Sequence, residues 1–216
     1  MGIKELIAKR AAQELTPHSV INLGIGIPTL VPDYLDESQF YLHTENGLLG
    51  VTSVAEEDID PNLVNAGKLP VGEAIGAAYF HSADSFAMIR GGHVDVAILG
   101  ALQVDGSGQV ANWAIPGKDI IGVGGAMDLL SGAKKIIITM GHVSKDGSPK
   151  FVERCTFPIT STRVADVVIT DLAVFHWKDG GYELTELMGD ATIDEVREKT
   201  TAAFRISEAL LQKEGG

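Results

Sequence analysis

An acidic residue on a predicted glycine turn is the clearest sign of chemistry in this sequence. Residues 40–44 alternate apolar and polar side chains and include aromatic and β-branched types, which predicts a strand. Glu45 follows directly, and Asn46-Gly47 is a dipeptide that tolerates positive φ and turns the backbone sharply. Strands of open α/β sheets end at ligand-binding crevices. Glu45 is therefore a candidate catalytic residue, and the alternative is a solvated glutamate in an ordinary turn.

Two glycine turns could supply backbone donors beside such an acid. The first, Gly24-Ile25-Gly26, follows a predicted strand over residues 18–23 and precedes a predicted short helix over residues 28–35. The second, residues 122–125, precedes a helical pattern. N–H groups exposed where a helix begins can stabilise a developing oxyanion, although either turn could be a mere tight connection. The candidate oxyanion- or substrate-binding residues are Gly24, Ile25, Gly26, Asn46, Gly124 and Gly125.

Other catalytic motifs are absent from the sequence. Gly24-Ile25-Gly26 lacks the third glycine of a dinucleotide fingerprint, and there is neither a phosphate-binding loop nor a nucleophilic serine elbow. No histidine pair shows metal-ligand spacing, so no metal site is expected, and His142, which follows an apolar run, is expected to be structural. Cys155 has no histidine beside it in the sequence, which favours a buried thiol over a nucleophile and leaves a spatial neighbour open. Covalent chemistry on a carboxylate remains the strongest hypothesis.

Composition indicates a single globular domain spanning residues 1–216. Of the 216 residues, 45% are hydrophobic and 21% are charged, which is ordinary for a soluble folded protein. No repeat or linker divides the chain. The 25 glycines point to many tight turns. A net charge of −12 without a basic cluster beyond Lys134-Lys135 argues against a nucleic-acid partner, because phosphate neutralisation needs a basic face.

The sequence also predicts a cytoplasmic protein without a membrane partner. The first 15 residues carry acids and bases in an amphipathic helical pattern, which is unlike a signal or transit peptide. No apolar run approaches the roughly 20 residues that span a bilayer. Cys155 is the one cysteine, which excludes an internal disulfide and fits a reducing compartment.

The arrangement of elements predicts an α/β fold with a mainly parallel central sheet flanked by helices. Residues 135–140 and 164–170 are near-continuous apolar runs of strand length, typical of strands buried on both faces. Thr192 is placed as the N-cap of a late helix, with Glu195 in the capping-box position. The acidic segment 56–70 is predicted to be a surface excursion. Helical patterns are predicted over residues 1–15, 72–81, 85–90, 126–133, 192–197 and 207–216.

Several motifs together resemble the β chain of the family I CoA-transferases, the enzymes of the 3-oxoacid type. The matching segments follow one another in order, without large gaps, from about residue 22 to residue 175. They are residues 22–28, 44–50, 85–93, 99–104, 111–118, 124–129 and 154–158. The resemblance is specific for the family and less specific for the acyl group.

The resemblance implies the CoA-transferase architecture, with Glu45 as the catalytic glutamate. In such enzymes the carboxylate attacks a donor acyl-CoA thioester and forms an acyl-glutamyl anhydride. The released CoA thiolate then attacks the glutamyl carbonyl, which gives a glutamyl-CoA thioester and frees the donor acid. An acceptor carboxylate runs these steps backwards. Coenzyme A is thus a substrate and part of a covalent intermediate, and no permanently bound cofactor is implied. Succinyl-CoA or acetyl-CoA as donor and acetoacetate as acceptor are expected.

Family members also need a glycine-rich α half that helps to bind coenzyme A, and this chain has no Gly-Gly-Phe-Gly run. The resemblance therefore implies an α-subunit partner, in an α2β2 heterotetramer, and the chain alone should be inactive. With its net charge of −12, the sequence shows no obvious cradle for the phosphates of coenzyme A. Two alternatives stay open: an acyl-CoA hydrolase on the same scaffold, and a non-catalytic α/β module that binds a sugar phosphate or another effector.

Overall fold

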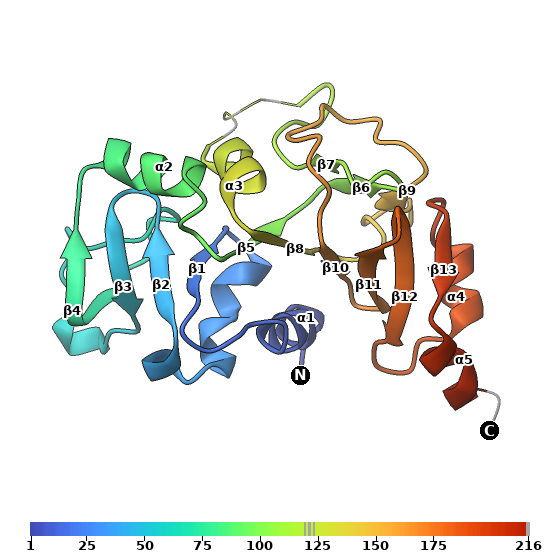
Figure 1. Cartoon of the computed structure of the whole chain (residues 1–216), viewed down its shortest axis with the longest axis horizontal. Helices are drawn as coiled ribbons and strands as arrows, with labels where there is room; N and C mark the ends of the chain where they lie inside the picture. Colours follow the sequence, from blue (N-terminus) through green and yellow to red (C-terminus); the bar gives the residue numbers. More distant parts are fainter. Residues whose placement is uncertain (119, 121, 123, 215–216) are drawn as a thin grey trace.

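A ten-stranded sheet forms the centre of the protein, in the order β13-β12-β11-β10-β8-β5-β1-β2-β3-β4 (Figure 1). The computed structural model describes residues 1–118, 120, 122 and 124–214. Five neighbouring strands in the middle are parallel, and antiparallel strands extend the sheet on both sides. The parallel five are β10 (Val167–Ile169), β8 (Lys135–Thr139), β5 (Val96–Gly100), β1 (Val20–Leu23) and β2 (Tyr41–Thr44).

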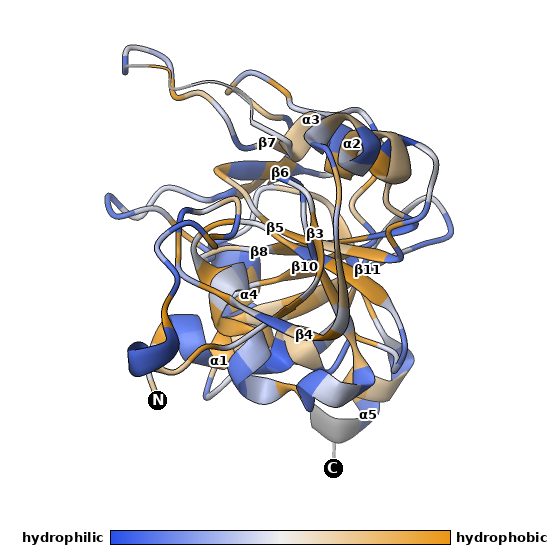
Figure 2. Cartoon of the chain, turned by 90° about the vertical axis from the view of Figure 1, so that its left-hand side faces the viewer, coloured by the Kyte–Doolittle hydropathy of each residue, from blue (hydrophilic) through white to orange (hydrophobic). Residues whose placement is uncertain are grey.

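The predicted mainly parallel sheet is confirmed, and its central strands are buried on both faces as their continuous apolar runs indicated. Ile136 and Ile138 of β8 belong to one hydrophobic cluster, whereas Ile137 between them belongs to the other. This alternation is what the two-residue period of a strand requires. Figure 2 shows the hydrophobic colour concentrated on the inner strands, with hydrophilic residues towards the outside.

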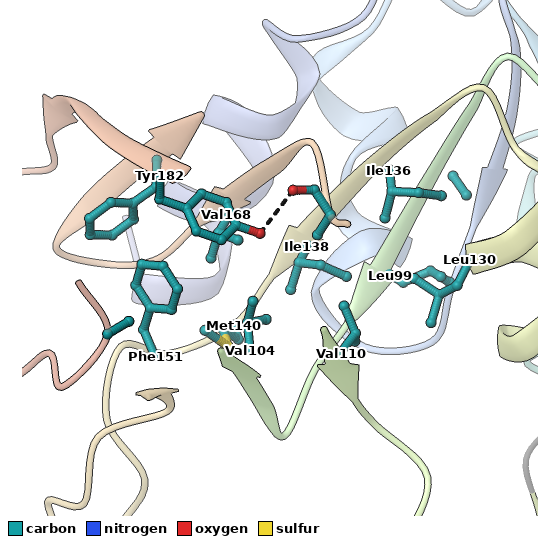
Figure 3. Close-up of a cluster of buried hydrophobic side chains, with 14 of the residues drawn as sticks. Leu99, Val104, Val110, Leu130, Ile136, Ile138, Met140, Phe151, Val168 and Tyr182 are labelled. Carbon is teal, nitrogen blue, oxygen red and sulfur yellow. Dashed lines mark hydrogen bonds between the residues drawn. The ribbon is translucent and has the colours of Figure 1, made fainter. Parts of the chain in front are cut away.

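Helices and a second small sheet cover the two faces. In Figure 1, α1 (Ile3–Ala12) lies below the sheet, and α2 (Ser82–Arg90) and α3 (Ala126–Gly132) lie above it. A three-stranded sheet shares the upper layer; its strands are β7 (Val110–Ala111), β6 (Gln103–Asp105) and β9 (Phe151–Val152). Its side chains join the larger core cluster, in which the Tyr182 hydroxyl donates to the Ala165 carbonyl at 2.8 Å (Figure 3).

The prediction of a helix over residues 72–81 is wrong. Gly72–Tyr79 is β4, the edge strand that pairs with β3 (Leu48–Thr52) in antiparallel register. Ile75 on this strand is fully exposed, so no buried stripe of period two marks the segment. The pairing partner lies more than 20 residues earlier, beyond the excursion, so tertiary contact overrides the local helical pattern.

Other elements agree with the sequence or refine it. The helix predicted over residues 28–35 is a pair of 3-10 turns, Ile27–Leu30 and Pro32–Tyr34. Thr192 caps α4 (Ile193–Glu198) by accepting from the Glu195 N–H at 3.2 Å, as predicted. The last predicted helix is α5 (Glu208–Glu214).

The C-terminal third contains a hairpin that the helical and parallel patterns did not predict. Strands β11 (Ala173–Lys178) and β12 (Gly181–Leu187) are joined by Asp179-Gly180, both at positive φ, and β13 (Phe204–Ile206) pairs with β12. Asp-Gly between two strand-like runs was the available signal, because a two-residue turn of this type needs positive φ at both positions. Within the described residues, the helices are all too short or too polar to cross a membrane.

His142 lies in the interior just after β8, as its position after an apolar run indicated. It is 0% exposed, and its ring nitrogens lie 2.9 Å from the Thr170 hydroxyl and 2.9 Å from the Thr200 hydroxyl. Burial lowers the pKa of His142 from its ordinary value of 6.5 to about 4. The folded protein therefore keeps this imidazole neutral at pH values where an unfolded chain would protonate it.

We predict that the free energy of unfolding decreases as the pH is lowered from 7 towards 4. Between pH 6.5 and 4 the unfolded chain binds a proton at His142 that the folded chain excludes, so stability is lost as the pH falls. The slope attributable to one such histidine approaches about 1.4 kcal/mol per pH unit. Urea denaturation at several pH values should show a shallower slope for His142→Gln and an unchanged slope for His93→Gln, which alters an exposed histidine. Equal slopes in the parent and His142→Gln would contradict this assignment.

Candidate active site

A crevice opens where the connections of the central sheet diverge. The chain passes from β1 to β2 on one side and returns later to β5 on the other side of β1. Ligands bind at such switch points, outside the carboxyl ends of the strands. A cavity of about 410 Å³ lies there. Its lining comes from the ends of β1 and β5, the turn after β2 and the residues before α3, and includes Leu23, Gly24, Glu45, Gly100, Gly124 and Gly125.

Glu45 lies in the tight turn between β2 and β3, as the sequence predicted. Gly47 in this turn has φ 125°, and a Cβ at this position would overlap the carbonyl oxygen of Phe80. The turn therefore depends on a residue without a side chain, which explains the Asn-Gly dipeptide. The resulting hairpin holds Glu45 half-buried at the edge of the cavity.

The two carboxylate oxygens of Glu45 have different surroundings. Oε2 accepts a hydrogen bond from the Asn22 Nδ2 at 3.1 Å. Oε1 faces the second glycine turn, because a Cβ added to Gly125 would lie 3.3 Å from Oε1 and 3.3 Å from Cγ of Glu45. One oxygen is thus held inside the protein, and the other faces the cavity beside backbone that carries no side chain.

The second glycine turn therefore meets Glu45 in space, although the two are far apart in the sequence. Gly124 has φ 55°, a backbone conformation suited to glycine, and Gly125 precedes the first residue of α3. Gly124 and Gly125 both line the cavity. Val123 of the predicted turn lies outside the described residues.

The first glycine turn also lies at the cavity, but one of its predicted donors is already engaged. The Gly24 N–H donates to the Ile98 carbonyl at 2.8 Å, which extends the pairing of β1 with β5. The expectation that Gly24 offers an oxyanion donor is therefore wrong. A Cβ at Gly24 would lie 2.9 Å from Cδ2 of Leu99, so this glycine permits close strand packing. Ile25 is 72% exposed and Gly26 has φ 96°, which leaves these two as the candidates in this turn.

Asn46 anchors the loop that follows β3 and makes no hydrogen bond to Glu45 among the described residues. Its Nδ2 donates to the Val64 carbonyl at 2.8 Å, and its Oδ1 accepts from the Thr44 hydroxyl at 2.8 Å. The same hydroxyl accepts from the Ala66 N–H at 2.8 Å, and Ala66 lines the cavity. The predicted surface excursion over residues 56–70 is therefore tied to the catalytic turn and forms one wall of the site.

Sequence reasoning missed a buried polar chain beneath Glu45. Asn22 Nδ2 lies 3.1 Å from His43 Nδ1, and His43 Nε2 lies 2.9 Å from Ser85 Oγ. The three side chains are 0%, 3% and 0% exposed, and burial lowers the pKa of His43 to about 4. A signal was present, because Asn22 and His43 are polar residues inside predicted strands that end at the same edge of the sheet. They are register partners in β1 and β2.

Three further polar residues of the family-like segments have structural partners. Gln103 Oε1 accepts from the N–H groups of Thr156 at 2.9 Å and Phe157 at 3.1 Å. Asn112 Nδ2 donates to the Gly100 carbonyl at 3.2 Å, which supports one wall of the cavity. Burial, together with nearby Asp105, raises the pKa of the Cys155 thiol to about 12. This thiol is unsuited to act as a nucleophile near neutral pH.

A second cavity of about 800 Å³ adjoins the first and shares Leu102 with it. Its lining includes Lys118, Lys145 and Lys150, with Asp146 as the one acid among the lining residues. Burial lowers the pKa of Lys150, which shows that its ammonium group is partly removed from water. The sequence did not reveal this basic site because the fold brings the lysines together from separate loops of an acidic chain.

Comparison with known proteins gives consistent matches over nearly the whole chain. The family model described as "Coenzyme A transferase" matches residues 4–199. The chain is 48% identical over 216 residues to the β chain of the acetate CoA-transferase of Escherichia coli K12, covering 100% of this chain and 99% of that protein. It is 49% identical over 210 residues to one of the two chains of the probable succinyl-CoA:3-ketoacid coenzyme A transferase of Bacillus subtilis, covering 96% and 97%.

A solved structure shares the fold. The apoenzyme of the acyl-CoA transferase YdiF from Escherichia coli O157:H7 matches with a TM-score of 0.77 and 26% sequence identity. The match covers 96% of this chain and 42% of the YdiF chain, so the present chain corresponds to about two fifths of that protein. A YdiF thioester complex with CoA matches with the same TM-score and 25% identity, over 97% of this chain and 43% of that one.

Proposed function

This chain belongs to the coenzyme A transferase family, and we propose that Glu45 is the residue through which it moves coenzyme A between carboxylic acids. One observation carries the proposal. Glu45 lies half-buried at the carboxyl ends of the central strands, with Oε2 held by Asn22 and Oε1 facing the cavity beside Gly125. A nucleophilic carboxylate must be ionised yet partly desolvated, and this position meets both requirements.

The proposed reaction uses the two oxygens of Glu45 differently. Oε1 attacks the thioester carbon of the donor, and the carbon–sulfur bond breaks to release the CoA thiolate and leave an acyl-glutamyl anhydride. The thiolate then attacks Cδ of Glu45, and the bond between Cδ and Oε1 breaks, so the donor acid leaves with that oxygen. The product is a glutamyl-CoA thioester. The acceptor carboxylate attacks Cδ in turn, and the same steps in reverse give the new acyl-CoA.

Backbone N–H groups around the cavity are proposed to stabilise the tetrahedral intermediates. The candidates are Ile25 and Gly26 on one side of Glu45 and Gly124 and Gly125 on the other. Donors fixed in this way need no reorganisation when charge develops, and loss of a single one typically costs about 10²–10³ in rate.

The proposed substrates follow from the relatives. Those matched over their full length are named as chains of acetate CoA-transferase or of succinyl-CoA:3-ketoacid transferase. We therefore propose acetyl-CoA or succinyl-CoA as donor and acetoacetate as acceptor. Short acids differ by a few atoms, and such differences change binding in an apolar pocket by only about 1–3 kcal/mol. A panel of donors and acceptors on the assembled enzyme would rank them.

An α subunit is proposed as the partner, in an α2β2 heterotetramer. The full-length relatives are each named as one subunit of their enzyme, which implies a second one, and the YdiF chain is more than twice as long as the part matched here. Coenzyme A enters as a substrate and becomes part of the covalent intermediate. The cavity bearing Lys118, Lys145 and Lys150 is proposed to receive its phosphates, because it joins the Glu45 cavity and concentrates positive charge.

Replacing Glu45 tests the proposed chemistry. In the enzyme assembled with its α subunit, Glu45→Gln should lower kcat by at least about 10⁴-fold, because no other group can carry the acyl and CoA units. Glu45→Asp should lower it by about 10²-fold, since the carboxylate is withdrawn by more than about 1 Å. The measurement is the initial rate of acyl-CoA formation with and without acceptor acid. Full activity in Glu45→Gln would contradict the proposal, and turnover without acceptor would indicate a hydrolase instead.

Replacing the cavity lysines tests the proposed phosphate site. Lys150→Met, and separately Lys118→Met, should raise the KM for acyl-CoA by about tenfold or more with little change in kcat. A charge-assisted hydrogen bond is worth about 1.5–3 kcal/mol, and each 1.4 kcal/mol corresponds to about tenfold in affinity. The control is Lys4→Met, which removes an exposed lysine of α1. Unchanged KM values in both cavity variants would place the phosphates elsewhere.

A further inference from the structure

The chain of side chains beneath Glu45 has a defined hydrogen-bond direction. An ionised carboxylate can only accept, so the Asn22 group that faces Oε2 must be its NH₂. The same nitrogen lies 3.1 Å from His43 Nδ1, which must therefore accept as well. A neutral imidazole that accepts at Nδ1 carries its proton on Nε2, and this N–H then donates to Ser85 Oγ at 2.9 Å. The direction of every bond follows from the charge on Glu45.

The opposite orientation of the Asn22 amide would place its carbonyl oxygen against the carboxylate. Nothing about asparagine itself prevents this, because its amide presents a donor on one side and an acceptor on the other. His43 decides between them. Its burial keeps the ring neutral, so Nδ1 remains able to accept. Both protons of the Asn22 NH₂ are then used, one by His43 and one by Glu45.

The observed orientation has a cost that indicates its purpose. Asn22 Oδ1 is buried and has no hydrogen-bond partner among the described residues. A buried acceptor left unpaired typically costs about 1–3 kcal/mol. The protein therefore tolerates an unfavourable carbonyl in order to direct the NH₂ towards Glu45. Ser85 on α2 and the ring of Phe80, which stacks on His43 with centroids 6.1 Å apart, hold the imidazole in place.

We propose that His43 is a positioning residue that fixes the Asn22 amide, so that one N–H stays on Oε2 of Glu45 throughout the reaction. This inference rests on the proposed role of Glu45. In the bond changes described above, Oε2 never leaves Cδ: it is a carboxylate oxygen, then the carbonyl oxygen of the anhydride and of the thioester. It also carries the negative charge whenever a thiolate or a carboxylate attacks Cδ. A fixed N–H at this oxygen stabilises that charge.

A double-mutant cycle separates positioning through Asn22 from a general structural effect. Asn22→Leu should lower kcat by about 10²–10³-fold with a smaller change in KM, because a donor to the developing oxyanion is lost. His43→Leu should lower kcat by a smaller factor. In the double variant kcat should equal that of Asn22→Leu alone, since His43 acts through Asn22. All variants are measured as the complex assembled with the α subunit.

Conservative substitutions at His43 provide a second test that does not depend on the leucine variants folding. In His43→Asn the Oδ1 can occupy the place of Nδ1 and accept from Asn22, so kcat should stay within about tenfold of the parent. In His43→Gln the amide reaches instead towards Ser85 and leaves the position of Nδ1 without an acceptor, so kcat should fall as in His43→Leu. His142→Gln is the matched control, because it alters an equally buried histidine away from the site.

Two results would overturn the proposal while leaving the role of Glu45 intact. The first is a loss of kcat caused by His43→Leu that is as large in the Asn22→Leu background as in the parent. The second is equal activity of His43→Asn and His43→Gln. Activity that survives the loss of Glu45 would instead remove the function on which the proposal rests, so the two failures are distinguishable.

Discussion

The structure depends on holding one carboxylate half-buried where the parallel strands end. A carboxylate in water is a poor nucleophile, and a fully buried one would take up a proton. Glu45 lies between these limits, with Oε2 on a single side-chain donor and Oε1 at a cavity. β1 supplies the donor, β2 supplies the acid, and β5 supplies the opposite wall. The sheet order that brings these three strands together is therefore the basis of the site.

Glycine and buried polar residues make this arrangement possible at close range. Gly47 lets the turn pass the Phe80 carbonyl, Gly24 lets β1 pack against β5, and Gly125 leaves room beside Oε1. Below the turn, Asn22 and His43 fill positions that apolar residues would normally occupy in a core. Their pairing satisfies most of their hydrogen-bonding groups and leaves the Asn22 carbonyl unpaired among the described residues. Such local departures from a simple core are expected where a fold carries function.

The sequence predicted the parts of the protein that are marked by local patterns. The apolar runs of β8 and β10, the Asn-Gly turn after Glu45 and the Thr192 cap all follow from neighbouring residues. The failures occur where contacts between distant segments decide. β4 pairs across a long excursion, the Gly24 N–H is taken by Ile98, and the basic cavity gathers Lys118, Lys145 and Lys150 from separate loops. His43 lies two residues from Glu45, yet its role depends on Asn22 and Ser85, which only the fold brings to it.

The most direct test of the central claim is to trap the covalent intermediate. The assembled enzyme would be incubated with acyl-CoA in the absence of acceptor acid, digested under acidic conditions and mapped by mass spectrometry. We expect one CoA adduct per active site, joined through a thioester to the peptide that contains Glu45 and lost when acceptor acid is added. A CoA adduct on any other residue, or rapid transfer without an adduct on Glu45, would contradict the account.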